Sequence, residues 1–157
     1  MAAELCRRGF LAATFSDAVP DYDMVALDSE GRAATVQVKT ILGGDWQLSN
    51  ASQLVDIELG EDLVQRVVGP KAAQAPCDIW VFVSLTGDSP DYYVATLAEV
   101  QELVCLRYAA YLDKHGGIKP RNPRSFHHAI RIGDLTDWKN RWDLVQDVVA
   151  RRSGAPA

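Results

Sequence analysis

The chain has 157 residues, of which 48% are hydrophobic and 24% charged, and its formal net charge is −5. This composition excludes a disordered or low-complexity protein and is typical of a globular one. No apolar run approaches the ~20 residues needed to cross a bilayer, and no signal-peptide pattern is found at the start, so we expect a cytoplasmic protein without a membrane segment. The acidic balance counts against the broad basic surface that nucleic-acid-binding domains usually carry.

The first half of the chain predicts a helix followed by strands. Residues 2–8 indicate a short helix that ends at Gly9, a residue common at helix C-termini. Three strands are then expected, at residues 10–15, 23–28 and 33–41. Residues 46–59 are ambiguous, although residues 53–59 alternate like a strand, and residues 61–68 favour a short helix.

The second half predicts strands and two longer helices. The apolar run at residues 79–85 is typical of a buried central strand. The further expected elements are a strand at 92–95, a helix from 97 to about 115, a strand at 128–132 and a closing helix at 136–149. The length favours one domain over residues 1–152, followed by a disordered tail at 153–157.

The two strands at 23–28 and 33–41 form a predicted hairpin around a polar turn at residues 29–32. In that register Asp23 falls opposite Val38, and a shift of one residue would place it opposite Lys39. Either register gathers Asp23, Gln37 and Lys39 at the hairpin end away from the turn. Because side chains alternate along a strand, Gln37 and Lys39 share one face, whereas Val36 and Val38 point to the core.

This set of residues suits a metal-dependent phosphodiesterase site. Mg²⁺ prefers oxygen ligands, and the candidates are the Asp23 carboxylate, the Gln37 amide oxygen and the Val38 carbonyl. Lys39 cannot bind a cation, but it can hold an attacking water or stabilise charge on a phosphate. The alternative is a surface ion pair near a strand end, which would contribute roughly 0–1 kcal/mol.

With Glu4 added, the pattern of Glu4, Asp23 and Gln37-Val38-Lys39 resembles the PD-(D/E)XK nuclease superfamily, in the variant whose third motif is Gln-x-Lys. The chain also looks like a group of small uncharacterised bacterial proteins of this superfamily. The segments that carry this second likeness in the back half are residues 80–85, 91–94 and 141–144.

The resemblance implies a restriction-endonuclease-like αβββαβ core, with a mixed central sheet flanked by helices. It also implies Mg²⁺-dependent cleavage of nucleic acid, with Mn²⁺ as a substitute, DNA as the expected substrate and a homodimer as the expected assembly. By the resemblance Asp23 is a metal ligand, Lys39 is the catalytic lysine, Gln37 replaces the usual acid, and Glu4 is the acid on the first helix. Asp23, Gln37, Val38 and Glu4 are the expected metal ligands.

Several residues outside this motif are candidate contacts for nucleic acid. Trp46 follows the motif in a Gly-rich loop, where its ring could stack on a base. The basic candidates are Arg7, Arg8, Lys119 and Arg121. A solvated charged surface is the alternative explanation for each of them. His127 and His128 are adjacent on a predicted strand and point to opposite faces, which argues against a shared metal ion.

Two further classes of function compete with the nuclease. One is a catalytically inactive nuclease-fold module that binds nucleic acid or a protein partner, and the other is a subunit of a larger complex. In a nuclease, the Glu4 and Asp23 carboxylates and the Gln37 amide should converge, with Lys39 beside them. A divergent arrangement would favour the binding module.

Overall fold

The computed structural model describes residues 1–15, 22–72 and 77–151. The chain divides into two compact units. The first comprises Met1–Gly44, Ala75–Leu97 and Leu135–Ala157, and the second comprises Asp45–Gln74 and Ala98–Asp134. The single domain expected over residues 1–152 stays a prediction, and the tail expected to be disordered, at 153–157, lies outside the described residues.

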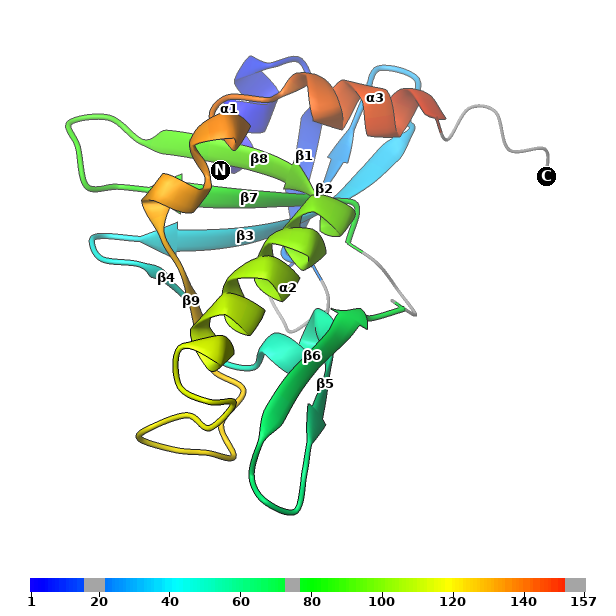
Figure 1. Ribbon diagram of the computed structural model, residues 1–157. Coiled ribbons are helices and arrows are strands. Elements are labelled where there is room, and N and C mark those ends of the chain that lie inside the picture. The colour runs from blue at the N-terminus through cyan, green and yellow to red at the C-terminus, as the bar shows by residue number, and fades with distance from the viewer. Residues whose placement is uncertain (16–21, 73–76, 152–157) are drawn as a thin grey trace. The chain divides into compact units, whose positions relative to one another are not determined.

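The first unit is built on a five-stranded mixed sheet with the strand order β1-β2-β3-β7-β8 (Figure 1). The strands are β1 (Leu11–Thr14), β2 (Met24–Leu27), β3 (Ala33–Ile41), β7 (Ile79–Ser84) and β8 (Asp91–Thr96). The central strand β3 pairs antiparallel with β2 and parallel with β7. The expected mixed α/β fold with a central sheet and flanking helices is confirmed.

Helices α1 (Ala2–Arg7) and α3 (Asp143–Arg151) pack on one face of this sheet (Figure 1). Leu5 of α1 is completely buried, and Val145 and Val149 of α3 join it in one hydrophobic cluster with the strands. The helix α1 ends as the sequence predicts, because Gly9 takes a φ of +90° that few other residues tolerate.

Strand register assigns every sheet residue to one of two faces. Val36 lies opposite Ile79, and Val38 lies opposite Val81, and these side chains belong to the helix-covered core. We call this the helix face. Gln37 and Lys39 of β3 point to the other face, called here the site face, because successive side chains of a strand alternate. The predicted division of β3 into a core face and a polar face is confirmed.

The hairpin register differs by one residue from the expected one. Leu27 pairs with Ala33, so that Asp23 falls beside Gln37 and not opposite Val38 or Lys39. Asp28 follows the last paired residue of β2 and closes the loop, and its backbone N–H donates to the Arg32 carbonyl at 3.0 Å. Its Oδ1 accepts hydrogen bonds from the backbone N–H of Glu30 and of Arg32, both at 2.9 Å. The loop is therefore one residue longer than predicted.

The second unit contains two small sheets and most of the long helix. Its elements are β4 (Trp46–Leu48), η1 (Ala51–Gln53), β5 (Val55–Leu59), β6 (Gln65–Pro70), α2 (Leu97–Asp113), β9 (His128–Ile130) and η2 (Ile132–Asp134). β4 pairs with β9, and β5 pairs with β6. No helix in the described part of the chain is both long and apolar enough to cross a lipid bilayer.

The short helix predicted at residues 61–68 is wrong. Leu63 takes a φ of +65°, and the Asp62 carboxylate accepts a hydrogen bond from the Val64 N–H at 3.1 Å. These two features make a turn, which reverses the chain so that Gln65 pairs with Leu59 in a hairpin. The local side-chain hydrogen bond competes with helix formation, as is common for aspartate.

The closing helix predicted at 136–149 is interrupted. A short 3₁₀ turn, η3 (Thr136–Trp138), precedes α3, and Asn140 between them has a φ of +59°. Asn140 N–H donates to the Tyr92 carbonyl at 2.9 Å, so the chain is pinned along the edge strand β8. Trp138 stacks against Phe82 on the site face, whereas Trp142 meets Tyr92 on the helix face.

The left-handed conformation of Asn140 gives a stability prediction. Replacing this exposed residue by valine should lower the free energy of unfolding by about 1–2 kcal/mol, because β-branched residues tolerate that conformation poorly. Asn140→Gly is the matched control and should leave the stability nearly unchanged. Urea denaturation of the two variants measures the difference, and equal stabilities would contradict the account.

Candidate functional site

The candidate site lies where β2 and β3 separate. Their pairing ends at Met24 and Val36, whereas β3 continues to Ile41, and β7 is the only described strand that pairs with this part of β3. Asp23 is the residue directly before β2. Its backbone N–H donates to the Val36 carbonyl at 3.0 Å, which fixes Asp23 at the point of separation.

The Asp23 carboxylate joins two of the residues that the sequence nominated. Its Oδ2 accepts a hydrogen bond from Gln37 Nε2 at 2.5 Å and another from the Val38 N–H at 2.7 Å. The β2–β3 ladder ends at Val36, and two residues further along β3 the Asp23 carboxylate, not a backbone carbonyl of β2, accepts the Val38 N–H. The carboxylate is therefore held in a fixed orientation before any ligand binds.

Lys39 lies on the same face of β3 as Gln37, about 7 Å further along the strand. In the register with β7, Gln37 is opposite Trp80 and Lys39 is opposite Phe82. Both polar side chains are partly exposed, while both aromatic side chains are buried. On the site face, the Gln37 amide and the Lys39 amine therefore lie beside two buried aromatic side chains, Trp80 and Phe82, called here the aromatic wall.

The donor set is one of hard oxygen atoms. Within the described residues, no three histidine, cysteine or acidic side chains gather closely enough to hold a metal ion. The candidate oxygen ligands are those of the Asp23 carboxylate, the Gln37 amide and the Val38 carbonyl. The Val38 carbonyl lies on the same edge of β3 as the Val38 N–H, which contacts Asp23. Such a set fits Mg²⁺, which retains several waters, better than it fits zinc.

The Gln37 amide presents its nitrogen, not its oxygen, to Asp23. An amide coordinates a cation through oxygen only. For Gln37 to share an ion with Asp23, its amide group would have to turn so that Oε1 takes the position of Nε2.

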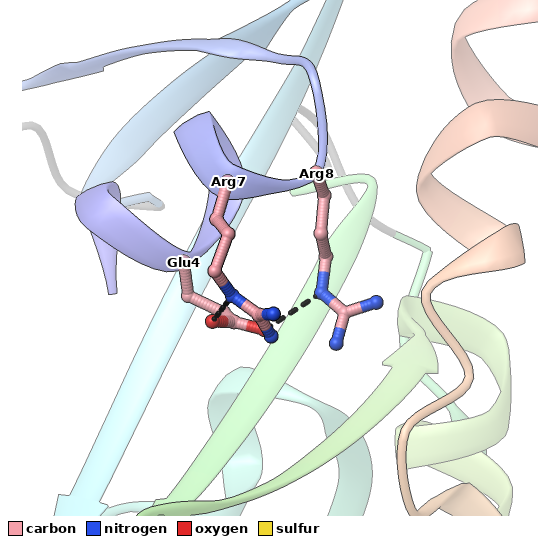
Figure 2. A network of polar contacts seen from close by, with 3 residues as sticks. All are labelled: Glu4, Arg7 and Arg8. Atoms are coloured by element: carbon pink, nitrogen blue, oxygen red, sulfur yellow. Dashed lines mark hydrogen bonds and ion pairs between the residues drawn. The ribbon is translucent and has the colours of Figure 1, made fainter.

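Glu4 is engaged by its own helix and not by this cluster. Its carboxylate accepts hydrogen bonds from Arg7 Nε at 2.9 Å, from Arg7 Nη2 at 2.8 Å and from Arg8 Nε at 2.8 Å. Figure 2 shows both arginines directed at it. These contacts lie within α1 and Arg8, the residue that directly follows it.

The surroundings of Glu4 belong to the helix face. The Arg8 guanidinium lies 4.3 Å from the centre of the Trp142 ring, which in turn meets Tyr92. Hydrogen bonds from Arg7 hold the pKa of Glu4 below its usual value, against an opposing effect of burial. Burial raises the pKa of Tyr92, and the Glu4 charge raises it further. Hydrogen bonds thus join Asp23 to Gln37 and Val38, whereas they join Glu4 to Arg7 and Arg8, and the expected metal role of Glu4 stays a prediction.

The residues nominated for nucleic-acid contact have different surroundings. Trp46 pairs with Ile130 across β4 and β9 and is only 1% exposed, so its ring is not presented for stacking and that expectation needs correction. Lys119 is buried, and its ammonium donates to the His127 carbonyl. Arg121 is exposed. Arg7 keeps 70% of its side chain exposed despite its bond to Glu4.

The aromatic wall beside Gln37 and Lys39 was not predicted. The apolar run at 79–85 predicts a strand buried on both faces. It does not predict which residues of that strand lie next to Gln37 and Lys39. The parallel register supplies that information by placing Trp80 beside Gln37. Trp138 completes the wall by stacking on Phe82 at 6.2 Å between ring centres.

The fold is similar to that of a solved structure, the bacterial homing endonuclease I-Ssp6803I. The TM-score is 0.51 at 16% sequence identity, and the similarity covers 98% of this chain and 90% of the other. At this identity the likeness shows a shared fold alone. No family model matches the chain, and no curated protein matches it. The PD-(D/E)XK assignment and its Gln-x-Lys variant stay predictions.

The arginine contacts of Glu4 predict a pH dependence of stability. Because the pKa of Glu4 is lowered in the folded state, its contribution is complete above the usual value of 4.5 and is lost as pH falls through the lowered value. Glu4→Gln should therefore destabilise the protein at neutral pH and become equivalent to the parent in strong acid.

Thermal unfolding of parent and variant, measured at neutral pH and near pH 3, tests this expectation. The control is Glu61→Gln, which alters an exposed carboxylate that forms no ion pair among the described residues. A Glu4→Gln deficit of the same size at both pH values would contradict the ion-pair explanation.

Proposed function

We propose that this protein is a metal-dependent nuclease that hydrolyses phosphodiester bonds of DNA. The observation that carries the proposal is the Asp23 carboxylate, fixed by Gln37 and Val38 at the separation of two strands, with Lys39 on the same face. The similarity of the fold to a homing endonuclease supports it. A cytoplasmic location and the homodimer expected from the resemblance belong to the same proposal.

Asp23, Gln37 and the Val38 carbonyl would hold the Mg²⁺ ion, or Mn²⁺ in its place. The ion, when bound, would polarise the phosphoryl group and lower the pKa of a coordinated water. Asp23 supplies the only negative charge of this set, so it is the residue on which metal affinity depends most. Gln37 is neutral and contributes orientation more than charge.

Lys39 provides the positive charge that the reaction requires. Its ammonium is a compact donor of three hydrogen bonds on a flexible stem. Placed beside the metal ligands, it can orient the attacking water or bind a phosphate oxygen on which negative charge develops. The buried rings of Trp80 and Phe82 border it on one side and lower the local dielectric, which strengthens this interaction.

The proposal leaves Glu4 outside the metal-binding set. Arg7 and Arg8 already neutralise its carboxylate, and a ligand would have to compete with three hydrogen bonds. Glu4 instead holds the two guanidinium groups in place on α1. Arg7 is exposed enough to contact a phosphate of the nucleic-acid backbone as well.

The second candidate function is an inactive module of nuclease fold that binds nucleic acid or a protein partner. Two observations favour it: the pairing of Glu4 with arginines, and the presence of one carboxylate among the described residues of the Asp23 cluster. Both candidates share the fold, and they differ in whether DNA is cut.

Cleavage of supercoiled plasmid DNA in Mg²⁺ tests the proposal. Lys39→Ala should lower the cleavage rate by at least about 100-fold, because it removes a charge that stabilises the transition state. Thr40→Ala is the matched control, since Thr40 is an exposed neighbour whose side chain lies on the opposite face of β3. The control should cut at the parental rate.

Retention of parental activity by Lys39→Ala would contradict the assignment of the catalytic site. Failure of the parent to cut DNA, combined with retained binding in a gel-shift measurement, would favour the inactive module. Loss of activity in the Thr40→Ala control as well would point to a folding defect, which the circular dichroism of both variants would reveal.

A further inference from the structure

The second unit contains a pocket of about 590 Å³ that the nuclease chemistry does not use. It is lined by the end of α2, by the loop that follows α2, and by β9 with the residues after it. This loop is the yellow segment of Figure 1. A volume of this size is within the range of sites that bind small organic ligands.

The pocket is positively charged, although the whole chain has a net charge of −5. Its five basic lining residues are Arg107, Lys114, Lys119, Arg121 and Arg131. Only two acids, Asp45 and Asp134, line it as well, so the formal charge of the lining is five minus two, or +3 with neutral histidines. A concave site of one charge sign concentrates ligands of the opposite sign.

Two of the five cations are engaged within the protein. Arg107 forms an ion pair with Asp134 at 2.8 Å, and the buried Lys119 donates to the His127 carbonyl beside the Tyr108 ring. The other three, Lys114, Arg121 and Arg131, are exposed. Within the described part of the chain no ion pair engages these three side chains. They are available to an anion.

The remaining lining offers an aromatic surface and a neutral hydrogen-bonding group. Tyr111 is 36% exposed, and its ring stacks at 16° on the buried Tyr108, which holds it rigid. His128 is 9% exposed, and its Nε2 has no hydrogen-bond partner among the described residues. Burial lowers the pKa of His128 to about 4, with a further contribution from Lys119, so this imidazole is uncharged at neutral pH.

We propose that this pocket binds a nucleotide, with the phosphate held by Lys114, Arg121 and Arg131 and the base placed against Tyr111. Arginine forms bidentate hydrogen bonds to phosphate, and every base can stack on a tyrosine ring. The nucleotide is either a free mononucleotide or part of a nucleic-acid strand. The inference is independent of the proposed nuclease function, because no residue of the Asp23 cluster takes part.

Calorimetry on the full chain in EDTA tests the pocket without involving a metal site. The probes are thymidine 5′-monophosphate, thymidine, inorganic phosphate and a ten-residue oligothymidylate. The monophosphate should bind more tightly than either phosphate or thymidine alone. Much tighter binding of the oligonucleotide would identify a strand as the source, and similar affinities would identify a free nucleotide.

Variants separate the pocket from general electrostatic attraction. Arg121→Ala should weaken binding of the monophosphate about tenfold, since it removes a charge-assisted hydrogen bond. The control Arg124→Ala removes an exposed arginine of the same loop that does not line the pocket, and it should change affinity less than about twofold. Tyr111→Leu should lower the affinity for thymidine 5′-monophosphate to that for inorganic phosphate, because it removes the ring against which the base is placed.

Three results would overturn the proposal. They are the absence of binding by all probes at millimolar concentration, equal losses in Arg121→Ala and Arg124→Ala, and an unchanged preference for the monophosphate in Tyr111→Leu. None of these results bears on DNA cleavage, which requires the metal that EDTA removes. A failure of the pocket is thus distinguishable from a failure of the nuclease proposal.

Discussion

The hydrogen bond from the Val38 N–H to the Asp23 carboxylate is the contact on which the candidate site depends. A backbone N–H that loses its ladder partner needs another acceptor. The pairing of β2 with β3 stops at Met24, the first residue of β2, while β3 continues, so among the described residues no strand pairs with Val38 on this edge. Asp23 supplies the missing acceptor, and in doing so it is brought against Gln37 at 2.5 Å. The geometry of strand separation thus places a carboxylate, an amide and a backbone carbonyl together.

The two faces of the sheet divide the nominated residues. Asp23, Gln37 and Lys39 gather on the site face, next to Trp80 and Phe82. Glu4 contacts Arg7 and Arg8 on the helix face, where Trp142 and Tyr92 surround the pair. The left-handed turn at Asn140 maintains this division, because it carries the chain across the edge of β8 and lets one aromatic residue pack on each face.

The hairpin, the alternation along β3 and the central strand β7 could be predicted from the sequence because each depends on a local pattern. The register could not, since it depends on whether Asp28 enters the strand or closes the loop. The prediction of a helix at 61–68 was wrong for a similar reason, because the Asp62 side chain accepts a backbone hydrogen bond and forms a turn instead. The contacts of Glu4 and the basic pocket could not be predicted either, because they depend on which segments of the chain lie side by side in the fold. Tyr111 and Arg131, for example, are distant in the chain and line one pocket.

Titration calorimetry with Mn²⁺ and Mg²⁺ tests the central claim, that Asp23 and Gln37 form a metal site, most directly. The parent should bind the ion, Asp23→Ala should lose binding, and Gln37→Glu should bind more tightly because it adds a carboxylate to the site. Absence of binding by the parent at millimolar metal, or unchanged binding by Asp23→Ala, would contradict the account.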